Sequence, residues 1–301
     1  MNLCRRDDSV SPLSMRRRPL SVALFLSLGV SWQSLARGDR VSADALRILQ
    51  ADVILSGRVS DITPRPFPNR GRVSLHIAAF KVLKGAIPKW TADTVEILGW
   101  VESEKADKLL FTPSQLHELG QKHLFLFATR SPQGDDKLYL QHPSENIRPY
   151  NAREAKALIA EIAHQATLVS EFAHAPYAQP DDTDRGIKSE LDRLITASAK
   201  QSAYWLLSVR CSVVPALIRQ MDDRRPYAGD ELAVGTGPGA FEGVAHYEPK
   251  LVVDAVSIIL GHLTNQSFGF IHNGGADEAR QREVTKWRTW LALTGGRPTC
   301  Y

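Results

Sequence analysis

The chain has 301 residues, which is enough for two ordinary domains. It contains 37 Lys and Arg against 33 Asp and Glu, a formal net charge of +4. The first 36 residues hold five of the basic and two of the acidic side chains, so the remainder, with 32 and 31, is nearly neutral and gives no electrostatic reason to expect nucleic acid.

The N-terminal segment has the pattern of a secretory signal peptide. Three arginines at 16–18 precede a short apolar run, Ser21 to Val30, and small residues at Ser34 and Ala36 form a cleavage site. We therefore expect residues 1–36 to be removed by cleavage after Ala36. An uncleaved membrane anchor is the alternative, although the apolar run is well short of the roughly 20 residues that span a bilayer.

Cleavage would leave a protein in the periplasm or outside the cell, with no stable membrane span. Translation from Met1 or from Met15 would each produce a signal of this kind. Cys4 would be lost with the signal, so that Cys211 and Cys300 remain. An oxidising compartment favours a disulfide between these two, while two free, partly buried thiols are the alternative.

Residues 43–148 are predicted to form a small β-domain. A short helix at 43–50 comes first, and turn-rich connections separate the segments that follow. Gly57 indicates a bulge or bend, and the apolar alternation changes phase between Ile77 and Phe80, as a second bulge would cause. The expected strands cover Ala51–Val59, Arg72–Leu83, Asp93–Leu98, Lys122–Thr129 and Lys137–Leu140.

Four short segments of this region resemble the bacterial netrin-like domains. They are Ala51-Asp52-Val53, Gly57-Arg58-Val59, Phe80-Lys81-Val82-Leu83-Lys84-Gly85 and Gly120-Gln121-Lys122-His123-Leu124-Phe125-Leu126-Phe127. The resemblance covers about a third of the chain and implies a five-stranded barrel of the OB type, related to the tissue inhibitors of metalloproteinases. At the Val-Leu-Lys-Gly turn we expect Lys84 to reach solvent and Gly85 to adopt a positive φ.

The inhibitory chemistry of those relatives is not expected here. Inhibitors of this type chelate the zinc of the target protease through an N-terminal cysteine. The mature chain would begin at Arg37, and its first cysteine is Cys211. The resemblance therefore implies a barrel without protease inhibition.

Residues 149–301 show helical periodicity instead. Helices are expected at 152–163 with an extension to 172, at 187–200, 202–209, 213–221 with Ser212 as the N-cap, 251–263 and 277–293. The segment from Val214 to Asp223 resembles one helix of a HEAT-type repeat, although the region has no clean repeat period. A small irregular helical bundle is the alternative arrangement.

A long insertion at 224–249 contains the glycine run Gly235-Thr236-Gly237-Pro238-Gly239. A phosphate-binding loop would follow a strand and precede a helix, and it would end in Gly-Lys-Ser or Gly-Lys-Thr. This run has an internal proline and no such ending. We interpret it as a mobile loop, with a functional lip as the alternative.

The last region brings His262, His272 and Asp277 together in the sequence. No pair among them has the i, i+4 spacing with which zinc hydrolases aim two imidazoles at one ion. Asp277 lies in the first turn of the final helix, where a carboxylate is favoured by the helix dipole. These residues are therefore only weak metal candidates, and we expect Trp287 and Trp290 to pack the helices.

The sequence thus predicts an α+β chain: signal peptide 1–36, an OB-type β-barrel at 43–148, and a helical, HEAT-like domain at 149–301. It contains no motif for a nucleophile with its base. We expect a non-enzymatic module without cofactors that binds another exported or envelope protein. A metal-dependent hydrolase or a ligand-binding protein using the His262, His272 and Asp277 region is the alternative.

Overall fold

The computed structural model describes residues 41–65, 71–87, 94–101, 118–133, 137–140, 143–235 and 244–300. These ranges belong to one unit of the chain, Gly38–Tyr301. The predicted signal peptide and its cleavage site after Ala36 lie outside them, and the domain boundary near residue 149 stays a prediction. None of the helices in these ranges is long and apolar enough to cross a membrane.

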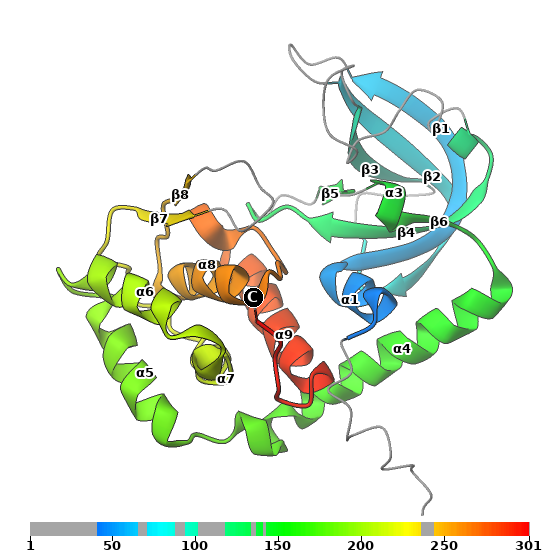
Figure 1. Cartoon of the computed structure of the whole chain (residues 1–301). Coiled ribbons are helices and arrows are strands. Elements are labelled where there is room, and N and C mark those ends of the chain that lie inside the picture. Colours follow the sequence, from blue (N-terminus) through cyan, green and yellow to red (C-terminus); the bar gives the residue numbers. More distant parts are fainter. Residues whose placement is uncertain are drawn as a thin grey trace, which may run out of the picture. The chain divides into compact units, whose positions relative to one another are not determined.

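The first part of the described chain is a curled, mostly antiparallel sheet (Figure 1). Adjacent strands follow the order β1-β2-β3-β5-β4-β6, and β1 also pairs with β4. The pairing of β3 with β5 is parallel. The strands are β1 (Val53–Arg65), β2 (Gly71–Lys84), β3 (Thr94–Val101), β4 (His123–Arg130), β5 (Leu138–Tyr139) and β6 (Ile147–Pro149).

The two predicted irregularities meet in a single bulge. Ser56 pairs with Lys81 and Arg58 with Ala78, so Gly57 of β1 faces two residues of β2. The extra residue lies in β2, where Ala79 has a φ of 47° and separates the two apolar phases of the strand. An extra residue of this kind bends the strand, and the sheet curls as a result.

The sheet is buried on both faces near its centre. Leu124 and Leu126 of β4 belong to the inner core of the curled sheet. Phe125 and Phe127, on the opposite face, pack in a second cluster with Ile48 of α1 (Ala43–Gln50) and with α4 (Ala152–Glu171). This double burial explains why β4 is almost entirely apolar rather than alternating.

The rest of the chain is helical. After α3 (Pro143–Asn146) and α4 come α5 (Asp182–Arg193), α6 (Ala199–Ser208), α7 (Val214–Arg219), α8 (Val252–Thr264) and α9 (Asp277–Leu293), with 3-10 turns η2 (Phe172–His174), η3 (Pro176–Ala178), η4 (Arg210–Val213) and η5 (Ile271–Asn273). The bounds of α9 match the prediction, whereas the predicted helix 187–200 begins earlier and ends at Arg193. The α+β class is therefore confirmed: a curled sheet followed by a helical C-terminal region.

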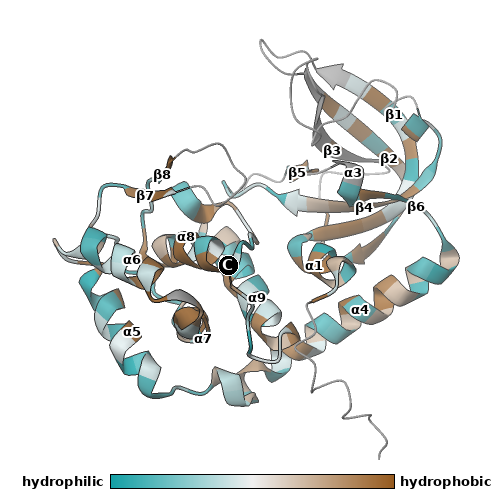
Figure 2. Ribbon diagram, in the orientation of Figure 1, coloured by the Kyte–Doolittle hydropathy of each residue, from teal (hydrophilic) through white to brown (hydrophobic). Residues whose placement is uncertain are grey.

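The core of the helical region surrounds α8. This helix is almost uniformly hydrophobic in Figure 2, and most of its residues are buried. Trp287 and Trp290 of α9 lie edge to face at 5.5 Å between ring centroids, and Phe268 packs against Trp287 at 4.7 Å. The tryptophans therefore serve as packing residues, as the sequence indicated.

The two regions share α1. Ile48 faces the sheet, whereas Leu49 packs in the core of the helical region. Helix α1 also contacts both α4 and α9. A short helix with two buried faces thus joins the sheet to the helices, and its C-terminal end lies at the centre of the site described next.

Candidate functional site

The metal candidates from the sequence have separate surroundings. His262 is exposed on α8. His272 packs edge-on against Tyr247 at 5.3 Å between ring centroids, and burial lowers the pKa of its imidazole. Asp277 is exposed and pairs with Arg280 at 3.3 Å. Within the described ranges, no group of three or more His, Cys, Asp or Glu side chains is placed to hold a metal ion.

Cys211 and Cys300 are joined by a disulfide, with their Cα atoms 5.5 Å apart. Cys211 lies in η4, directly before α7, and Cys300 follows the last helix. The bridge therefore attaches the C-terminal segment to the helical core.

The insertion at 224–249 is not simply a loop. Its flanks form an antiparallel pair, β7 (Leu232–Gly235) with β8 (Val244–Tyr247). Leu232 and Val234 are buried, so their side chains hold β7 against the helical core. Two four-residue strands are too short for a periodic signal, which is why the sequence did not predict them. Gly237, Pro238 and Gly239 lie outside the described residues.

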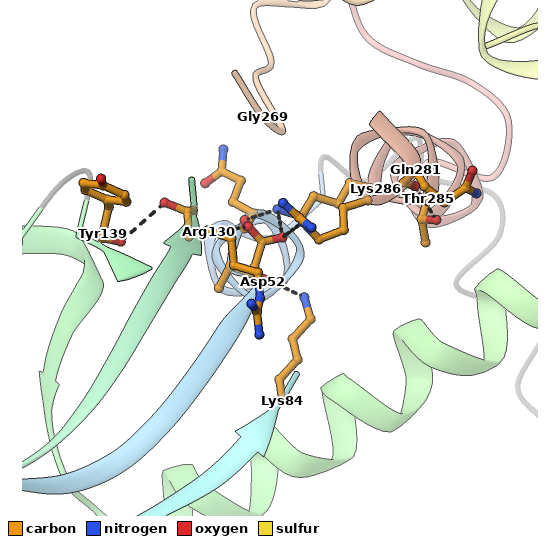
Figure 3. Close-up of polar contacts among 12 residues, drawn as sticks. Asp52, Lys84, Arg130, Tyr139, Gly269, Gln281, Thr285 and Lys286 are labelled. Carbon is orange, nitrogen blue, oxygen red and sulfur yellow. Dashed lines mark hydrogen bonds and ion pairs between the residues drawn. The ribbon is translucent and has the colours of Figure 1, made fainter. Parts of the chain in front are cut away.

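One well-connected polar cluster was not singled out by the sequence. It is formed by Asp52, Lys84 and Lys286, from the start of the sheet, the end of β2 and the buried side of α9 (Figure 3). The cluster gathers around the C-terminal end of α1, where the backbone carbonyls have no partners within the helix.

Two lysines supply hydrogen bonds to these carbonyls. The Lys84 ammonium donates to the carbonyls of Ile48 at 2.5 Å and Ala51 at 2.7 Å. The Lys286 ammonium donates to the carbonyl of Gln50 at 2.6 Å. Cations are favoured at this end of a helix because its dipole is negative there. The expectation that Lys84 reaches solvent is therefore wrong, because its ammonium caps a helix.

Asp52 supplies the negative charge of the cluster. Its Oδ1 lies 2.7 Å from Nζ of Lys286 and 3.7 Å from Nε of Arg282. Its Oδ2 accepts a hydrogen bond of 2.8 Å from the backbone N–H of Arg130 in β4. The side chains of Asp52 and Lys286 are only 8% and 9% exposed, so this ion pair is largely shielded from water.

Gly85 positions Lys84. It has a φ of +74°, as the sequence predicted, and a Cβ at this position would lie 2.2 Å from the carbonyl oxygen of Asp52. Only glycine combines that backbone conformation with such a close approach. The Lys-Gly pair thus places the end of β2 directly against Asp52.

The charge balance of the cluster leaves Lys84 incompletely compensated. Burial, together with the nearby Lys286 ammonium, lowers the pKa of Lys84 to about 7, although Asp52 acts in the opposite direction. A substantial fraction of this side chain is therefore a neutral amine near pH 7.

The cluster forms the floor of a groove of about 490 Å³. The groove lies between α1, α4 and α9, and it is lined by both lysines, by Leu49 and by Val169. Ligand sites of proteins typically measure roughly 300–1,000 Å³ and combine apolar walls with a few polar groups. The volume and the lining of this groove are both of that kind.

A partial signal for the cluster exists in the sequence. Asp52 and Lys84 both lie in segments on which the prediction of a netrin-like domain rests. In α9, Arg280, Glu283 and Lys286 are charged but buried, interspersed with the apolar stripe. Charged residues at such positions need buried partners, although the sequence does not identify them.

A scan against protein-family models finds no match for this chain, and a search of curated proteins finds none either.

Proposed function

We propose that the mature chain is an exported bacterial protein that acts as a non-catalytic protein-binding module. The observation that carries this proposal is an aromatic pair on α6. Tyr204 and Trp205 are 39% and 44% exposed. Exposed tryptophan and tyrosine are enriched among the residues that dominate the affinity of protein interfaces.

The setting of this pair supports a preformed contact surface. The hydroxyl of Tyr204 donates to the carbonyl of Ala233 in β7 at 3.1 Å, which fixes its ring. The opposite side of α6 is anchored by Ala203 and Leu206, both fully buried. An aromatic surface on a rigid helix loses little conformational entropy when a partner binds.

We further propose that the curled sheet is an OB-type barrel of the netrin-like kind. The pairing order supports this proposal, because it runs from β1 through β2, β3, β5 and β4 and returns to β1. For the helical region we propose a HEAT-like stacking of α7, α8 and α9. Its support is that both α8 and α9 contact α7 across one common core.

The protein-binding proposal is tested with photo-crosslinking side chains in living cells. One variant carries the crosslinker in place of Trp205, and its control carries it in place of Tyr150, which is 40% exposed and lies beyond β6. We expect one discrete crosslinked partner from position 205 and none from position 150. The partner is then purified, and W205A is expected to weaken its binding at least tenfold while Y150A has no effect.

Two results would overturn the proposal. One is equal crosslinking from positions 205 and 150, which would indicate non-specific contact. The other is turnover of a generic ester, peptide or phosphate substrate by the purified mature protein. N-terminal sequencing of the cell-envelope and external fractions tests export separately, because cleavage after Ala36 would yield a chain that starts at Arg37.

A further inference from the structure

We propose that the groove between α1, α4 and α9 is a binding site for a free aliphatic carboxylate. Its charged end would lie toward Lys84 and Lys286, and its hydrocarbon tail along α4. This site is separate from the aromatic pair on α6 and goes beyond the protein-binding function proposed above.

The walls of the groove fit a hydrocarbon chain. Helix α4 contributes Ile162, Ala166 and Val169, which follow one another at helical spacing along one side. Leu49 and Ala51 at the end of α1 extend the apolar lining toward the lysines. Val169 is 39% exposed, so apolar surface at this end of the groove faces water and would be buried by a bound tail.

The floor of the groove favours an anion. The charged groups facing Lys84 are Asp52, Arg282 and Lys286, with the exposed Glu278 at the rim, and the residues that α4 contributes to the lining carry no charge. The carboxyl of Glu283 in α9 is also buried and interacts with Lys286, and burial raises its pKa. The ammonium groups of Lys84 and Lys286 repel one another, which contributes to the lowered pKa of Lys84, and a carboxylate bound beside them would offset that repulsion.

Each of the two lysine ammonium groups also has one more N–H than the hydrogen bonds described above use. A lysine ammonium has three N–H groups. Within the described residues, Lys84 uses two of them on Ile48 and Ala51, and Lys286 uses two on Gln50 and Asp52. The remaining N–H of each lysine can bind a carboxylate oxygen without disturbing the cap of α1. Two charge-assisted donors next to apolar walls are complementary to a ligand with one carboxylate and a hydrocarbon tail.

Binding would be linked to proton uptake. A carboxylate placed beside Lys84 would favour its charged form and raise the pKa of the side chain from about 7. At pH 8 most of the Lys84 population is neutral in the free protein, so the ligand would bind together with most of one proton. A purely hydrophobic ligand would not have this effect.

The proposal is tested by titration calorimetry of the purified mature protein with decanoate, and with decan-1-ol as an uncharged probe of equal chain length. We expect saturable binding of one decanoate per chain, at least tenfold tighter than that of decanol. V169E places a negative charge on the wall and should weaken decanoate binding at least tenfold. I159E is the matched control, because Ile159 lies on the same helix, is 44% exposed and does not line the groove.

The titration is repeated at pH 8 in two buffers of different ionisation enthalpy, which measures the number of protons taken up. No saturable decanoate binding, equal affinity for decanol, or equal effects of V169E and I159E would each overturn the site. Binding without proton uptake would overturn the role of Lys84. The crosslinking from α6 is independent of all these outcomes, so the failure of one proposal leaves the other in place.

Discussion

The Oδ1 of Asp52 lies 2.7 Å from Nζ of Lys286, which joins the link between α1 and β1 to α9. Both side chains are almost completely buried. The same ammonium also caps α1 through the carbonyl of Gln50. One side chain of α9 therefore contacts the segment that links α1 to the sheet in two ways.

We predict that K286M strongly destabilises the protein. Removing Lys286 takes the nearest cation away from the buried carboxylate of Asp52 and leaves it with Arg282 at 3.7 Å. Breaking a buried pair in this way costs up to roughly 3–5 kcal/mol in the free energy of unfolding. The control is K250M, because Lys250 pairs with Glu248 at the surface, with side chains 60% and 70% exposed. Exposed pairs contribute roughly 0–1 kcal/mol.

Urea unfolding measures both variants. D52N combined with K286M should recover part of the loss, since the lone buried carboxylate is then absent. A loss from K286M as small as that from K250M would mean that water already reaches the pair.

A second prediction concerns Lys84 and pH. Its pKa is lower in the folded chain, at about 7, than the ordinary value of 10.5. Between these two values the unfolded chain binds more protons than the folded chain, so the free energy of unfolding rises with pH. The slope from this group is at most about 1.4 kcal/mol per pH unit. K84M should remove this slope as well as the helix cap.

The measurement compares slopes rather than absolute stabilities, from urea unfolding at several pH values between about 7 and 9. K188M serves as the control, because Lys188 is an exposed residue of α5. If K84M retained the slope of the wild-type chain, the ammonium of Lys84 would be fully compensated in the folded protein.

A third prediction concerns Glu283 of α9. Burial raises the pKa of its carboxyl, although the hydroxyl of Ser257 donates to Oε1. Oε2 has no hydrogen-bond partner among the described residues, and the indole N–H of Trp287 favours the charged form without reaching hydrogen-bond geometry. The stability that this group contributes is present below its ordinary pKa of 4.5 and is lost as the pH rises through the raised value.

E283Q keeps a neutral side chain at every pH. We therefore expect its melting temperature to decline less than that of the wild-type chain as the pH rises from about 5 to 8. The matched control is E190Q, since Glu190 also accepts a hydrogen bond from a serine, Ser202, but pairs with Arg193 as well. If the melting temperatures of E283Q and the wild-type chain changed equally with pH, Glu283 would be ionised in the folded protein throughout this range.

The local parts of the fold could be predicted from the sequence, because their signals lie within one element. Val284, Trp287 and Leu291 recur on one side of α9, and the bounds of that helix were predicted correctly. Gly57 and the change of phase before Phe80 both indicated the position of one bulge, in which the extra residue belongs to β2. Strand β6, with three residues, and the pair β7 and β8 were missed because segments this short have no measurable period.

The site could not be predicted for a different reason. Lys84 contacts α1, which is separated from it in the sequence by β1 and the rest of β2. Lys286, in the last helix, contacts the same helix α1. Such contacts depend on how the sheet and the helices meet. A lysine before a glycine at the end of a strand can either extend into solvent or contact another element. The local pattern favours solvent, which is why the sequence predicted that environment for Lys84.

The last prediction tests whether the turn at Gly85 positions the cluster. Gly85 and Gly295 have φ values of +74° and +60°, so alanine at either position incurs the strain of a left-handed conformation, roughly 1–2 kcal/mol. A Cβ at Gly85 would also lie 2.2 Å from the carbonyl oxygen of Asp52, whereas at Gly295 it would have no neighbour within 4 Å among the described residues. G295A therefore isolates the backbone strain.

We expect G85A to lower the free energy of unfolding by at least roughly twice as much as G295A, because β2 must move away from the carbonyl of Asp52. That movement would also withdraw Lys84 from its two carbonyls. The slope of stability against pH above about pH 7 should then be smaller in G85A and unchanged in G295A. Equal losses in the two variants, with the slope intact, would show that the cluster forms independently of this turn.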